Sequence, residues 1–112
     1  MNEKLIEPVN RIVSLLVVGR YADLEQQTHG VRLTANEMAK AIADYGRTLV
    51  PPPQDGFKLM NVVEIKEAQP KRWSVAIPLW TKEEGRSDLT VEMTIVERED
   101  TFLIELDDIH VL

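Results

Sequence analysis

The second half of the sequence alternates apolar and polar side chains with a period of two residues, and this pattern constrains the fold more than any other feature. Successive side chains of a β-strand point to opposite faces, so each alternating stretch predicts a strand with one face on a core. Residues 73–80, 89–96 and 102–106 show the pattern, and a shorter stretch shows it around Val63 and Ile65. The inward positions are Trp73, Val75, Ile77, Leu79, Leu89, Val91, Met93, Ile95, Phe102, Ile104 and Leu106. The polar stretches EAQPK, KEEGRS and EREDT predict hairpin loops, so the strands should form an antiparallel meander.

Two irregularities are expected within these strands. Apolar residues occupy even positions up to Leu106 and odd positions from Ile109 onward. One extra residue at Asp107–Asp108 would keep both runs on the same core, and a β-bulge is an insertion of this kind. Pro78 has no amide hydrogen, so its strand should lie at a sheet edge or carry a bulge there.

The first half of the sequence has helical spacing instead. Apolar residues at intervals of three and four predict a first helix from about residue 3 or 8 to Val18. Pro8 suits the first turn of a helix better than its interior, so the regular part is expected to begin near Glu7. Gly19 permits a turn into a short second helix over residues 21–27.

A third helix is predicted by its cap. Thr34 and Glu37 have the spacing of a capping box, in which each side chain bonds the backbone of the other residue. The helix should end around Gly46. The stretch GVRLT before it is expected to form a brief strand, with Val31 and Leu33 on one side.

The stretch VPPPQDG, residues 50–56, divides the helical part from the strand part. Three successive prolines end the preceding helix and the Asp-Gly pair supplies a turn. Neither half could close a core alone, so residues 1–112 should be a single domain. The expected class is α+β, with about three N-terminal helices packed on a curved antiparallel sheet of about four strands.

This order of elements resembles the nuclear transport factor 2-like, or cystatin-like, cone fold. The likeness lies in the long helix, the stretch VVGRYADLEQQ that turns into a short helix, the brief strand, the capped third helix and the meander ending in FLIELDDIHVL. The fold is shared by isomerases, dehydratases, polyketide cyclases, transport adaptors and toxin-immunity proteins, so the resemblance leaves the function open. The catalytic residues of the family have no matching motif here, and none is assigned.

Composition excludes several classes of function. The net charge of −6 and the lack of any basic run longer than two residues argue against nucleic acid as a partner. There is no cysteine, which excludes disulfides and thiolate metal sites. The longest apolar run has seven residues, too few to cross a bilayer. We therefore expect a cytoplasmic bacterial protein that contacts no membrane.

The C-terminal stretch IELDDIHVL gathers Glu105, Asp107, Asp108 and His110. A metal needs at least three ligands that converge, whereas alternate residues of one strand lie about 7 Å apart. We therefore expect neither a metal nor a cofactor and interpret the stretch as the solvated face of a strand. The alternative is general acid–base catalysis by His110, oriented by Asp107 or Asp108.

A second alternative is a small-molecule-binding or isomerase- or cyclase-like enzyme with a pocket inside the cone. Asp44 or His110 would then act as the base, and Tyr21 and Tyr45 would border the pocket. The inward positions offer almost no polar side chain for such a pocket, so the sequence favours a protein without catalytic activity.

The outer face of the sheet is the preferred candidate for an interaction surface. Its predicted members are Trp80, Pro78, Glu92, Val96 and Glu105, with Asp107 extending the acidic rim. An exposed tryptophan among aliphatic side chains is typical of interfaces, although a loop could also cover it. The partner would be a basic protein, as in an immunity-type module, or a second copy in a homodimer.

Overall fold

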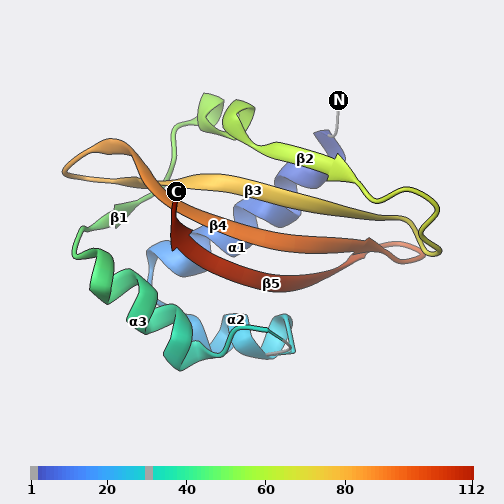
Figure 1. Ribbon diagram of the computed structural model, residues 1–112, viewed down its shortest axis with the longest axis horizontal. Helices are drawn as coiled ribbons and strands as arrows, with labels where there is room; N and C mark the ends of the chain where they lie inside the picture. The colour runs from blue at the N-terminus through green and yellow to red at the C-terminus, as the bar shows by residue number, and fades with distance from the viewer. Residues whose placement is uncertain (1–2, 30–31) are drawn as a thin grey trace.

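The computed structural model describes residues 3–29 and 32–112, and it confirms the predicted α+β class, with N-terminal helices packed against one antiparallel, open and curved sheet (Figure 1). The helical elements are the 3-10 helix η1 (Glu3–Leu5), α1 (Ile6–Val17), α2 (Tyr21–Gln27), α3 (Ala35–Tyr45) and the 3-10 helix η2 (Gln54–Leu59). The strands are β1 (Leu49–Val50), β2 (Asn61–Glu64), β3 (Arg72–Thr81), β4 (Gly85–Glu97) and β5 (Phe102–Val111).

β3 and β4 form the centre of the sheet. β4 pairs with β3 on one side and with β5 on the other. β1 and β2 both pair with the remaining edge of β3, β1 opposite Trp80 and Thr81 and β2 opposite residues 73–76. The sequence predicted about four strands. The fifth is the two-residue β1, which is too short to show any alternation.

The helices cover one face of this sheet. α1 crosses behind β3 and β4 in Figure 1, and α2 and α3 lie along the β5 side. α1 contributes a stripe of side chains that are at most 2% exposed: Val9, Ile12, Val13 and Leu16. Leu24 of α2 and Met38 of α3 are fully buried in the same core. Each such side chain contributes about 1.5–3 kcal/mol by leaving water, so this packing holds the helices on the sheet.

The predicted helix ends are confirmed. Pro8 lies in the first turn of α1, where its missing amide hydrogen costs no intrahelical bond. Gly19, with φ of 77°, allows the Arg20 amide to donate to the Leu15 carbonyl at 2.9 Å. At α3 the Glu37 amide donates to Thr34 Oγ1 at 3.2 Å and the Thr34 amide donates to Glu37 Oε1 at 2.9 Å, the two bonds of a capping box.

α3 ends at Gly46, whose φ of 74° lies in the left-handed region. The expected strand at GVRLT lies partly outside the described residues, because Gly30 and Val31 are not among them. Its described part, residues 32–34, contains no strand.

The bulge predicted in β5 is confirmed. Glu92 pairs with Asp108 while the next residue, Met93, pairs with Leu106, so Asp107 is the extra residue. As a result Leu106 and Ile109 both face the core and are 1% and 6% exposed.

Pro78 also lies at an irregularity of the sheet. β3 is not an outermost strand, but its register with β4 shifts between Pro78 and Trp80. Ser87 bridges the shift, because its hydroxyl donates to the Leu79 carbonyl at 2.8 Å and accepts from the Leu89 amide at 3.1 Å. The bulge that was predicted as one alternative is therefore present.

The opposite edge of β3 explains why proline fits this strand. The Arg72 carbonyl accepts from Ile65 on the β2 side and the Lys82 amide donates to Thr48 on the β1 side. Even-numbered residues of β3 therefore turn their backbone groups to that edge. Neither β1 nor β2 pairs with Pro78, so its missing amide hydrogen faces a gap between them.

The prediction of which side chains around β2 face the core is wrong. Val63 and Ile65 were expected on the core, but they are 55% and 40% exposed. Val62 is half-buried instead, because it pairs with the inward Val75, whereas Val63 pairs with the outward Ser74. Paired residues of an antiparallel ladder share a face, so the register with β3 decides which valine is buried.

Candidate functional site

The inner face of the sheet is filled by hydrocarbon. The predicted inward residues of β3 and β4, from Trp73 to Leu79 and from Leu89 to Ile95, are all at most 1% exposed. Among the described residues, the buried polar side chains are hydroxyls: Thr28, Thr81, Ser87 and Thr90. Neither a carboxylate nor an imidazole is buried in the described core. The pKa of an acid or a base therefore cannot be tuned there by burial.

The C-terminal cluster lies on the outer face. His110 is one-third exposed, with Nδ1 at 3.1 Å from Asp108 Oδ2 and Nε2 at 3.7 Å from Glu92 Oε2. The closer contact lacks the angle of a hydrogen bond, since Nδ1 is without a bonding partner. Asp107, the bulge residue, is not paired with the histidine: its Oδ2 accepts from Thr94 Oγ1 at 2.7 Å, and Arg32 Nε lies 3.5 Å from its Oδ1.

The other residues of the catalytic alternatives lie on the helices. Asp44, on α3, is exposed and accepts a hydrogen bond from Lys40 Nζ at 2.7 Å. This bond raises the pKa of Lys40. Tyr21 is half-buried and packs against the core.

Tyr45 contacts the β3–β4 turn. Its hydroxyl donates to the Glu84 carboxylate, with oxygen distances of 2.9 and 3.0 Å. Partial loss of contact with water and this hydrogen bond raise the pKa of Tyr45. In the same turn, the Glu83 carboxylate accepts from the Thr48 amide and hydroxyl, both at 2.9 Å, which lowers the pKa of Glu83. These contacts tie α3 and the residue before β1 to the turn.

No group of three or more histidine, cysteine, aspartate or glutamate side chains in the described ranges could hold a metal ion. Nor is any described helix both long and apolar enough to cross a membrane.

Some residues of the predicted interaction surface are shielded from solvent, and others remain accessible. Trp80 is half-buried beneath η2: a Cβ on Gly56, within η2, would lie 3.2 Å from Trp80 Nε1. Val96, although on the outward register, is only 4% exposed. Pro78, Glu92 and Glu105 keep partial contact with solvent.

A groove of about 370 Å³ lies beside these accessible residues on the outer face. Its lining comes from η2, β2, β3, β4 and the C-terminus: Leu59, Asn61, Ala76, Pro78, Arg86, Ser87, Asp88, Thr90, Glu92 and Leu112. Sequence reasoning placed Ala76, Pro78, Thr90 and Glu92 on the outer face and missed the other lining residues. Asp88 could also have been found, because it continues the outward alternation of Thr90 and Glu92 along β4. No local pattern in the sequence brings Leu59 or Leu112 to the groove.

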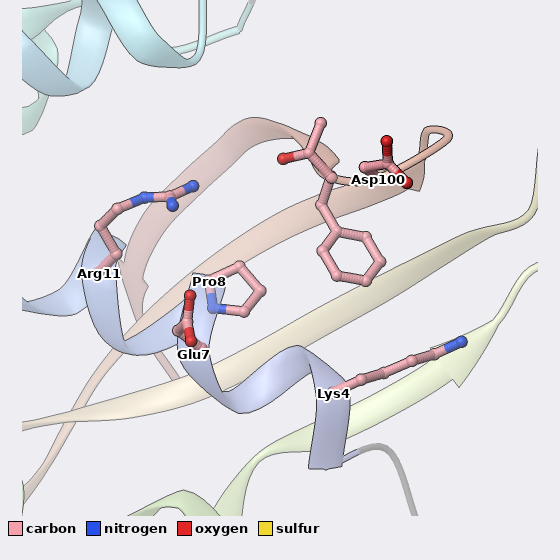
Figure 2. Close-up of a pocket in the computed structure, with 7 residues that line it drawn as sticks. Lys4, Glu7, Pro8, Arg11 and Asp100 are labelled. Atoms are coloured by element: carbon pink, nitrogen blue, oxygen red, sulfur yellow. The ribbon is translucent and has the colours of Figure 1, made fainter.

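A second pocket, of about 270 Å³, lies between α1 and the β4–β5 turn. Its lining includes two apolar residues, Pro8, which is labelled in Figure 2, and Phe102. The two basic side chains at its rim point away from each other: Lys4, from η1, extends along the sheet over the Trp73 ring at 4.9 Å, while Arg11 comes from α1 (Figure 2). Lys4 and Arg11 therefore do not form a joint anion site.

The fold and the surface together define a small α+β protein whose ionisable groups all lie outside its core in the described chain. Residues 13–112 match the family model described as a domain of unknown function, DUF7668, and the chain belongs to this family. No curated protein matches the chain, and no solved structure does either. The resemblance to the cystatin-like cone fold therefore stays a prediction.

Proposed function

We propose that this protein is a non-catalytic protein-interaction module of the bacterial cytoplasm that binds a basic protein partner through the outer face of its sheet. An immunity-type role, in which the partner is a toxin, is one form of this function. The lack of cysteine in the sequence supports the location.

The observation that carries the proposal is the contrast between a filled core and a carboxylate-rich outer face. The alternative, an enzyme with a pocket behind the sheet, needs a cavity with an acid or a base in it. The positions that would line that cavity hold Val75, Ile77, Val91 and Met93, all at most 1% exposed.

Charge favours a basic partner over a second copy. Glu92, Glu105 and Asp108 occupy neighbouring outward positions of β4 and β5. Two copies that paired through this face would bring like charges together, with a net charge of −6 on each chain. A cationic partner gains from the same field, which also accelerates its association.

The test is affinity capture from the native host with mass determination of the eluted proteins. The wild type is compared with the double variant Glu92→Lys, Glu105→Lys. The matched control, Glu3→Lys with Glu99→Lys, makes the same change in net charge at exposed positions away from this face.

We expect a partner that the wild type and the control retain and that the outer-face variant loses, with all three proteins unfolding at similar urea concentrations. A partner captured equally by the outer-face variant would refute the assignment of the surface. Turnover of a small molecule by the purified wild type would refute the non-catalytic function.

A further inference from the structure

The groove on the outer face combines an apolar floor with carboxylates at its rim. Ala76 and Pro78 are half-buried on the outward register of β3 and form the floor. Leu59 and Leu112, which are 43% and 80% exposed, add apolar walls. The Leu112 amide donates to the Asp88 carbonyl at 3.1 Å, which holds this wall against β4.

The charged side chains that line the groove all come from β4. Arg86, Asp88 and Glu92 all line it, with Arg86 and Glu92 six positions apart on the strand. Glu92 faces Ala76 on β3 and Asp108 on β5, and its side chain is 43% exposed. The Glu92 end of the groove is therefore negative, while Arg86 counters the charge at the other end.

We propose that this groove receives an arginine or lysine side chain from a basic segment of the partner, with its cationic head at Glu92. The inference rests on the proposed function and names the chemistry that the surface recognises. The long side chain of either residue lays an aliphatic stem on apolar surface and keeps its charge at the polar end. Ala76, Pro78 and Leu59 meet the stem, and Glu92 meets the head as a charge-assisted hydrogen-bond acceptor.

His110 borders the position proposed for the cationic head. Its Nε2 lies 3.7 Å from Glu92 Oε2, so the imidazole limits the space on that side of the carboxylate. Asp108 Oδ2 lies 3.1 Å from His110 Nδ1 on the other side of the ring. On β4, the residue paired with His110 is Thr90.

The experiment uses the full chain labelled with ¹⁵N and a defined probe. The probe is the peptide acetyl-Gly-Arg-Gly-Arg-Gly-amide, and its control replaces both arginines by citrulline, which has nearly the same shape without the charge. We expect saturable shifts of the amide signals of Ala76, Thr90, Glu92 and Leu112 with the arginine peptide. The citrulline peptide should bind about tenfold more weakly, since a charge-assisted hydrogen bond is lost.

Variants locate the contact. Glu92→Gln should weaken binding of the arginine peptide by about tenfold, whereas Glu99→Gln, with the same change of net charge on the β4–β5 turn, should change it by less than about twofold. Ala76→Leu fills the groove without altering any charge and should also weaken binding. It keeps the proposal testable if Glu92→Gln does not fold.

Three outcomes would overturn the inference. Equal binding of the citrulline peptide would mean that no cation is recognised. Shifts confined to Thr94, Leu103 and Glu105 would move the contact out of the groove while leaving the outer face as the interaction surface. Dimerisation that shifts the groove signals as protein concentration rises would identify a second copy as the occupant.

Discussion

The two faces of the central strands differ in what they offer a ligand. On the inner face, Val75, Val91 and Met93 are fully buried in one cluster with the apolar side chains of α1. On the outer face, the alternating residues of the same strands include Glu92 and Thr94, which remain partly open to water. The described core holds no buried carboxylate or imidazole, whereas ionisable side chains lie on the outer face. The outer face of the same strands is where a partner could bind.

The largest difference in stability is expected between two single-residue deletions in β5. Deletion of Asp107 removes the bulge residue and leaves Leu106 and Ile109 facing the core, so the protein should stay folded with a loss of about 1–2 kcal/mol. Deletion of Glu105 turns Leu106 outward and carries Asp107 into the core. We expect it to cost more than about 4 kcal/mol or to prevent folding.

Both deletions are measured by urea unfolding monitored by tryptophan fluorescence. Similar stabilities of the two variants would mean that the faces of β5 are interchangeable, and the contrast between them would then fail.

Large-to-small substitution compares the faces directly. Ile95→Ala on β4 should lower the free energy of unfolding by about 2–5 kcal/mol, because Ile95 is fully buried and its removal leaves a cavity. Ser74→Ala, on the outward and exposed side of β3, should change it by less than about 0.5 kcal/mol. Chemical denaturation measures both. A cost below about 1 kcal/mol for Ile95→Ala would indicate an inner face that is loosely packed.

A smaller effect is expected where the register of the two central strands shifts. Ser87→Ala removes the hydroxyl that bonds Leu79 and Leu89, leaving a buried carbonyl and amide without that partner. We expect a loss of about 1–3 kcal/mol. Asp88→Ala, at the neighbouring exposed position, serves as the control. Equal stability of Ser87→Ala and wild type would show that the shift needs no side-chain bridge.

The smallest effect concerns an ionisable group at the surface. Glu83 accepts two hydrogen bonds from Thr48, and its folded-state pKa is lowered from the ordinary value of 4.5. The carboxylate therefore stabilises the fold above that value, and the contribution is lost as the pH falls through the lowered pKa. The stability difference between wild type and Glu83→Gln should shrink below about pH 4.5. A difference that stays constant on acidification would contradict the role of these bonds.

Local patterns in the sequence predicted much of this structure. The capping box of Thr34, the turn at Gly19 and the bulge at Asp107 each depend on neighbours within a few positions. β1 could not be predicted, because its two residues carry no period. In β2, Val62 and Val63 are both apolar, and only the register with β3 decides which of them faces the core.

The candidate site was predicted only in part, for a related reason. Pro78 and Glu92 follow from the outward phase of their strands. By contrast, η2 covers Trp80, and Leu59 and Leu112 reach the groove, only through contacts distant in sequence. The catalytic alternatives at His110 and Asp44 had the right residue types without a shared cavity.

The gap that Pro78 leaves along β3 bears on how this protein avoids aggregation. A free stretch of sheet edge normally invites a stray strand from another chain, which extends the ladder. Here the space between β1 and β2 presents a ring nitrogen where such a strand would need a hydrogen-bond donor. The ring of Pro78 and the neighbouring η2, which packs against β3, thereby both oppose extension of the sheet at this gap.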